Sequence, residues 1–316
     1  MLLTLVAAAF IFGGGSDAAM AASVSAATGK NLVVLADPDN RWPSVHVDYQ
    51  SPIELETIIK RRYDVRFSKG VKGEPTNAIW SAGRYPYSFF HKQSLFDYVR
   101  LPQSEAKLDR TWPLTIPADP SGYLTIEQLC ALTKKPTKIH WFYQKARLAV
   151  AVQNCSESEL MNLIAAAVGA RLVETATERR FDLNVDELRK RATALFDWKV
   201  NRKFSQSDVK DASYMLALYE WLSDAQLADL YSAPEHVVRI AIPRNSRLEK
   251  LAAERLWDIM GSPDADIRTL TQEQIRSRRD MMGRIDFSQG FQAALYSNGN
   301  PACRVPFKNS DMGLVY

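Results

Sequence analysis

The chain has 316 residues, of which 46% are hydrophobic and 24% charged, and its formal net charge is +4. This length is enough for two or three domains with apolar cores, and the composition is that of a globular protein rather than a disordered one. The charge excess is small and no half of the chain is strongly basic, so we expect no nucleic acid as a partner.

The N-terminus has the pattern of a secretory leader. Residues 2–12 are apolar, a glycine run follows, and Ala19-Met20-Ala21 fits a small-x-small cleavage rule. We therefore expect a signal peptide over residues 1–26 and an exported protein, periplasmic or extracellular. The apolar stretch is shorter than the roughly 20 residues that a membrane-spanning helix needs, so we expect no transmembrane span after signal removal. No Lys or Arg precedes it, which leaves open a buried N-terminal strand or helix, or a cytoplasmic protein with a different start.

Residues 45–67 and 150–172 read as two copies of one unit. Each copy predicts a short alternating strand, a helix opened by Ser-x-x-Glu, and a second short strand. We interpret the unit as a small α/β module that the chain uses twice. The matching pairs are Val45/Val150, Val47/Val152, Ser51/Ser156, Glu54/Glu159, Leu55/Leu160, Ile59/Ile164 and Arg66/Arg171.

Residues 27–110 form the first expected domain, an α/β module with an aromatic-rich loop. A strand is predicted at 31–36 and a short helix at 94–99, and aromatic side chains cluster between these segments. Aromatic residues in an irregular segment can line a binding groove, although they also form the packed floor of a long loop. The candidate binding residues are Trp80, Tyr85, Tyr87, Phe89 and Phe90.

Residues 111–180 form the second expected domain, with the element order β-α-β-β-α-β. Strands are predicted at 111–117, 138–143, 148–152 and 170–175, the middle two as a hairpin. Thr125 and Ser156 have the positions of helix N-caps, and Gly169 is placed to end the second helix in a left-handed conformation.

Five stretches of this domain carry a family resemblance: LTIPADP from Leu114, LTIEQL from Leu124, LAVAV from Leu148, SESEL from Ser156 and GARL from Gly169. Together, residues 111–177 resemble the short N-terminal domain of secretins and TonB-dependent transducers. The resemblance implies the same element order, docking to other envelope proteins and no catalytic residues. The rest of the chain departs from these families because it predicts helices, so the resemblance implies no transport role.

Cys130 and Cys155 both lie in the second domain. In an exported protein they could form a disulfide, and the alternative is a pair of buried free thiols. Cys303 would then be left over, and no two of the three cysteines have the spacing of metal ligands.

Residues 181–316 predict a mainly helical region, with helices at 185–198, 207–222 and 246–260 and a strand at 237–242. The expected fold class is therefore α+β, with small β-α-β-β-α-β modules followed by this mainly α-helical C-terminal region.

No motif for catalysis, a metal or a cofactor is present: the sequence has no HExxH, CxxC, G-x-S-x-G or phosphate-binding loop. The leading hypothesis is an exported, non-enzymatic protein whose modules dock an envelope protein. The alternative is an exported enzyme, a hydrolase, with its site between the α/β part and the helical part.

Overall fold

The structure is a computed structural model, and it describes residues 8–36, 41–63, 65–67, 78–81, 101–201, 206–260, 290–297, 302–305 and 313–315. Helices and several small sheets are both present, so the fold is α+β, as the sequence predicts. The chain divides into two compact units, residues 1–188 and 189–316.

The first unit begins with a module in which strands and helices alternate around one apolar core. The module contains β1 (Ala8–Phe12), α1 (Asp17–Thr28), β2 (Leu32–Leu35), β3 (Val45–Tyr49), α2 (Pro52–Tyr63), β4 (Val65–Phe67) and β5 (Ala78–Ser81). Helix α1 begins at the Ser16 cap and ends at Gly29, whose φ of 67° is easily adopted without a side chain. Helix α2 begins at Ser51, whose hydroxyl accepts a hydrogen bond from the Glu54 amide at 3.2 Å.

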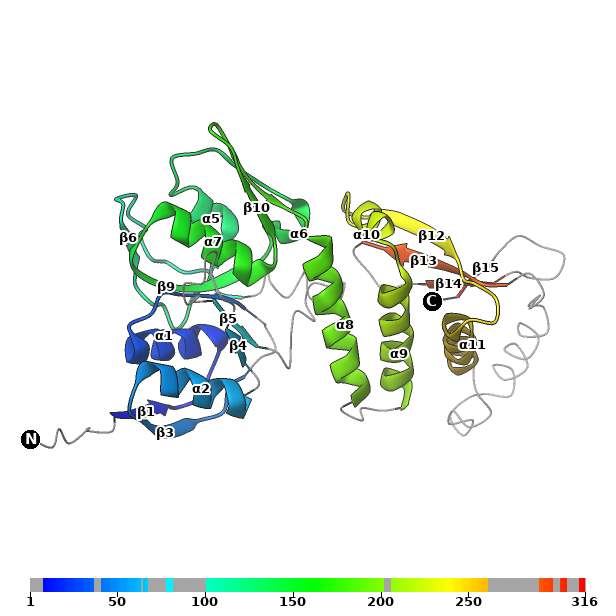
Figure 1. Ribbon diagram of the computed structural model, residues 1–316, viewed down its shortest axis with the longest axis horizontal. Coiled ribbons are helices and arrows are strands. Elements are labelled where there is room, and N and C mark those ends of the chain that lie inside the picture. Colours follow the sequence, from blue (N-terminus) through cyan, green and yellow to red (C-terminus); the bar gives the residue numbers. More distant parts are fainter. Residues whose placement is uncertain are drawn as a thin grey trace, which may run out of the picture. The chain divides into compact units, whose positions relative to one another are not determined.

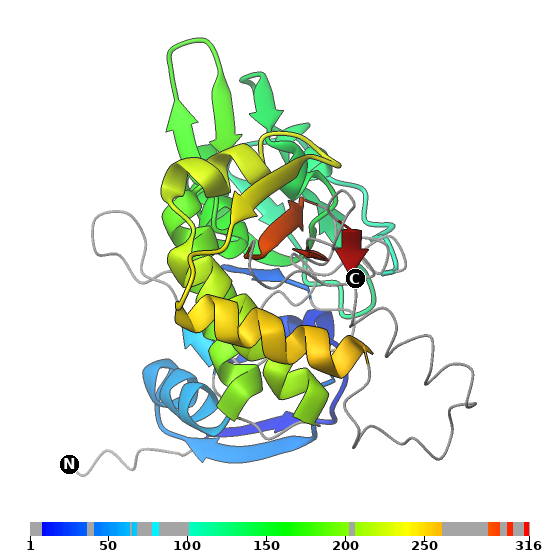
Figure 2. The same cartoon turned by 90° about the vertical axis from the view of Figure 1, so that its right-hand side faces the viewer.

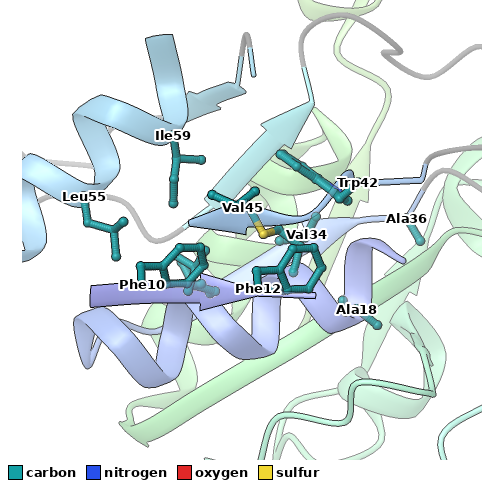
Figure 3. Packing of buried hydrophobic residues seen from close by; sticks show 14 of the residues in the cluster. Phe10, Phe12, Ala18, Val34, Ala36, Trp42, Val45, Leu55 and Ile59 are labelled. Atoms are coloured by element: carbon teal, nitrogen blue, oxygen red, sulfur yellow. The ribbon is translucent and has the colours of Figure 1, made fainter. Parts of the chain in front are cut away.

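The core of this first module includes the segment that resembles a leader. Phe10 and Phe12 of β1 are buried, and Figure 3 shows them in one cluster with Leu55 and Ile59 of α2. The indole of Trp42 donates a hydrogen bond to the buried Asp17 carboxylate at 2.8 Å. In this fold, residues 8–28 are therefore a strand and a helix with buried side chains.

A second module follows in the same unit. It contains β6 (Leu114–Ile116), β7 (Leu124–Thr125), α5 (Ile126–Cys130), β8 (Thr137–Ile139), α6 (Trp141–Gln144), β9 (Arg147–Cys155), α7 (Glu157–Val168), β10 (Arg171–Glu174) and β11 (Arg179–Asp182). Thr125 and Ser156 cap α5 and α7, and Gly169 ends α7 with a φ of 74°.

The two modules share one strand topology, which extends the repeat seen in the sequence. When the two-residue strand β7 is left out, each module has five strands, and the first pairs antiparallel with the third: β1 with β3 and β6 with β9. In each module the last strand also pairs with two others, antiparallel with one and parallel with the other. In the first module β5 is antiparallel to β4 and parallel to β2, and in the second β11 is antiparallel to β10 and parallel to β8. Residues 8–81 and 114–182 thus form two tandem copies of one topology.

Pairing of β2 with β9 joins the modules. These strands are antiparallel, with Val33 opposite Val150, and they merge the described strands β4, β5, β2, β9 and β6 into one sheet, with β7 also paired to β9. Asn31 fixes the junction, because its side chain accepts from the Gln153 amide at 2.7 Å and donates to Glu159 at 3.2 Å. Figure 1 shows the resulting layers, with α1 and α2 on one side of this sheet and α5 and α7 on the other.

Two expectations for the second module were wrong in detail. The strand predicted at 138–143 ends at Ile139, and residues 141–144 form α6, whose first amides are capped by His140. The predicted hairpin is also absent: β8 pairs with β11, whereas β9 pairs with β2 and β6. Alternating polarity indicates an extended segment, but it does not select the neighbouring strand.

The second unit contains a sheet as well as helices. Helix α8 (Val185–Asn201) begins at the end of the first unit and continues into the second. The other described elements of the second unit are α9 (Gln206–Trp221), α10 (Asp224–Leu230), β12 (Val237–Ala241), α11 (Arg247–Met260), β13 (Gln292–Tyr296), β14 (Ala302–Val305) and β15 (Gly313–Val315). The four strands pair antiparallel in chain order, and Figure 2 shows β12 in yellow above α11 in gold. The expected helical region therefore also holds an antiparallel sheet. Among the described residues, no helix is long and apolar enough to cross a membrane.

Candidate functional site

The aromatic groove predicted from the sequence falls mostly outside the described residues. Trp80 lies in β5, opposite Arg66 of β4, and nothing further is described of its side chain. Tyr85, Tyr87, Phe89 and Phe90 lie outside the described residues, so a groove formed by them stays a prediction.

The two cysteines of the second module are free thiols in the structure, so the disulfide that their positions allowed is not formed there. Burial raises the pKa of both Cys130 and Cys155 to about 12. A thiol with so high a pKa is protonated at neutral pH and is a poor nucleophile or metal ligand. Both thiols are therefore free, with Cys155 buried and Cys130 half-buried, while Cys303 has no described side-chain environment.

The described histidines have separate local roles. His140 caps α6 through its Nδ1 atom, His236 lies 3.2 Å from Asp229, and His46 is exposed on β3. Among the described residues, no group of three His, Cys, Asp or Glu side chains is placed to hold a metal ion.

The surface that stands out is the outer edge of β8, and it is identified by comparing the modules. The matching strand of the first module, β2, has its second edge occupied by β9. In the described part of the chain β8 pairs with β11 alone and forms the end of the sheet β10–β11–β8. The edge of β2 that joins the two modules thus corresponds to an edge of β8 that lies at the end of its sheet.

Backbone hydrogen bonds show which groups point outward from β8. The Arg179 amide donates to the Pro136 carbonyl and the His140 amide donates to the Phe181 carbonyl, both at 3.0 Å. Because backbone groups alternate in direction along a strand, Thr137 and Ile139 direct theirs away from β11. The Ile139 carbonyl accepts from the side chain of Gln144 at 3.3 Å, which leaves the Thr137 amide and carbonyl and the Ile139 amide as the outward groups.

An ion-pair network around one buried arginine supports this edge. The Arg179 side chain is only 2% exposed and donates to Glu157 of α7 at 3.0 Å and to Glu174 of β10 at 3.1 Å. Lys135, just before β8, also donates to Glu174, at 2.6 Å. These contacts connect α7, β10, β11 and the start of β8, so the edge is held on a fixed support.

The outer face beside the edge carries mixed charges with one extra cation. Lys138 is 72% exposed and lies 2.7 Å from Glu178, and this hydrogen bond lowers the pKa of Glu178. Arg180 lies 3.1 Å from Asp182, which Arg171 also approaches at 3.8 Å. Three cations and two partly exposed carboxylates therefore share the outer face of the sheet β10–β11–β8, and Lys138 is the one on the edge strand.

Sequence reasoning found the strand but missed the edge. The sequence predicted a strand at 138–143, but the alternation of side chains does not show whether a strand is internal or at an edge. The exposed Lys138 was the one available hint, because natural edge strands often carry lysine.

Comparisons with known protein families, with curated proteins and with solved structures found no match to this chain.

Proposed function

We propose that this chain is a non-enzymatic docking protein that binds another protein by strand addition at the outer edge of β8. The observation that carries the proposal is a difference between matching strands. Among the described residues β8 is the end strand of its sheet, whereas its counterpart β2 pairs with β9 along the same edge. Main-chain hydrogen bonds provide the affinity in strand addition, and the edge offers both donors and an acceptor.

Two further features support docking. Lys135 and the buried Arg179 hold the edge strand in place, so little ordering is needed when a partner strand binds. The resemblance of residues 111–177 to the short N-terminal domain of secretins and TonB-dependent transducers implies the same kind of role. The envelope location stays a prediction from residues 1–26, and the docking edge does not depend on it.

Site-specific crosslinking in the cells that make the protein tests the proposal. A photoreactive amino acid replaces Lys134, an exposed residue three positions before β8, and in the control it replaces the exposed Lys250 of α11. We expect a discrete adduct with one other protein from position 134 and none from position 250. The Thr137→Pro variant should lose this adduct, because proline removes the outward amide donor. Equal adducts from both positions, or none from position 134, would refute docking at β8.

A further inference from the structure

The charge on β8 determines what kind of strand the edge accepts. We propose that the partner presents an extended segment that adds antiparallel to β8 and places an acidic residue opposite Lys138, with apolar residues on either side. This inference rests on the proposed docking function and names the chemistry of its partner. It follows from comparing β8 with β2 position by position.

The internal pair β2–β9 sets the direction and the side-chain pattern. When Val45 is aligned with Val150, residues Leu32, Val33 and Val34 of β2 align with Thr137, Lys138 and Ile139 of β8. The strand that pairs with β2 runs antiparallel to it. Thr137 and Ile139 are half-buried on the inner face, as Leu32 and Val34 are buried on the inner face of their module, so the partner residues opposite them should be apolar.

Lys138 is the position at which the two edges differ. Its counterpart Val33 is fully buried in the shared sheet, where α7 of the second module also contacts β2. Lys138 is 72% exposed and lies 2.7 Å from Glu178, and a second helical layer over β8 would remove this ion pair from water at a cost in free energy. The partner should therefore contribute a strand whose outer face stays open to solvent and carries an opposite charge.

Pairing of β8 with a second copy of itself is disfavoured by the same lysine. If β8 of one copy pairs antiparallel with β8 of a second copy along all three residues, Lys138 lies opposite Lys138 of the second copy. Because its backbone groups point to β11, this would be a pair without hydrogen bonds, in which side chains approach most closely. Like charges in that position are destabilising, whereas a carboxylate there is stabilising. Arg180, the neighbour of Lys138 on β11, adds a second cation to the same face.

A pair of synthetic peptides tests the inference by NMR on the full chain. The acidic probe is acetyl-Ser-Val-Glu-Val-Ser-amide, and the control replaces Glu with Lys. We expect the acidic peptide to shift the amide signals of Thr137, Lys138 and Ile139 and to slow hydrogen exchange at Thr137 and Ile139. The lysine peptide should bind several-fold more weakly, on the order of fivefold. The Lys138→Glu variant should reverse this preference, and Lys250→Glu, which changes net charge equally, should preserve it.

The outcomes separate the two proposals. Equal binding of both peptides at β8 would overturn the acidic partner and leave strand addition standing. No shift at β8 with either peptide would overturn both. Signals at β8 that change with protein concentration alone would show a second copy on this edge and would also overturn the inference. A Lys138→Ala variant that retains the preference for the acidic peptide would contradict the assigned role of Lys138.

Discussion

Arg179 shows how one residue organises the second module. Its guanidinium group is almost fully removed from solvent and contacts carboxylates from two other elements, Glu157 of α7 and Glu174 of β10. A buried charge is tolerated only when it is paired and hydrogen-bonded, so the position of this strand relative to the helix is defined by those contacts. The sequence itself presents Arg179 as one of two adjacent arginines without distinguishing them.

Replacing Arg179 with methionine should destabilise the first unit by about 2 kcal/mol, because the buried guanidinium loses its charge-assisted hydrogen bonds to two partly exposed carboxylates. The measurement is urea unfolding followed by circular dichroism. The matched control is Arg180→Met on the same strand, whose side chain is 43% exposed and whose ion pairs should contribute less than about 1 kcal/mol. Similar losses from both variants would show that Arg179 is not the organising charge.

The same network predicts how stability depends on pH. Hydrogen bonds from Lys135 and then from Arg179 lower the pKa of Glu174 in the folded protein. A carboxyl group with a depressed folded pKa contributes stability above its unfolded pKa of about 4.3, and this contribution is lost as pH falls through the folded value. The urea midpoint should therefore hold from pH 7 to about pH 5 and fall below about pH 4. The Glu174→Gln variant should show a shallower acid slope, and an unchanged slope would contradict the assignment.

At the scale of elements, β1 and α1 have an unexpected position. The leader-like pattern of residues 1–26 comes from small and apolar side chains, which are also what a buried strand and a tightly packed helix require. Phe10, Phe12, Met20 and Val24 are buried here, and β1 corresponds in topology to β6 of the second module. Hydrophobicity alone cannot distinguish a segment that is recognised for secretion from one that fills a core.

We predict that removal of residues 1–21 destabilises the first unit. Cleavage after Ala21 would remove β1 and the first turns of α1, exposing the apolar side chains of Val45, Leu55 and Ile59 to water. A variant lacking residues 1–21 should not unfold cooperatively on heating, and the intact mass and N-terminal sequence of the protein purified from its host show whether this cleavage occurs. A mature N-terminus at Ala22, with a cooperatively folded product, would support the leader interpretation and contradict this prediction.

For the whole molecule, the shared sheet makes the first unit cooperative across both modules. Val33 of β2 is fully buried, lies opposite Val150 and belongs to a strand that contacts helices of both modules. The second unit has its own buried residues on β12 and β13, including Val238 and Ala293. Damage at the β2–β9 junction should therefore spread through both modules of the first unit.

Val33→Ala should destabilise the first unit by about 2 kcal/mol through the cavity it leaves. Hydrogen exchange followed residue by residue should speed up equally in β3 and β11, which belong to different modules. The control is Val238→Ala, the same chemical change in the second unit, which should accelerate exchange in β12 and β13 only. Acceleration confined to β2 and its module in the Val33→Ala variant would show that the modules unfold independently.

The sequence by itself determined the local elements and the repeat. Ser51 and Ser156 begin helices, Gly169 ends one, and the matched positions Leu55 and Leu160 are both fully buried, because capping and periodic burial depend on residues a few positions apart. Only the tertiary structure decided that β2 pairs with β9 while β8 is an end strand, that Arg179 is buried, and that the leader-like segment lies in a core. Those outcomes depend on contacts between different elements, and the alternation of side chains along one strand is the same whether or not its edge is occupied.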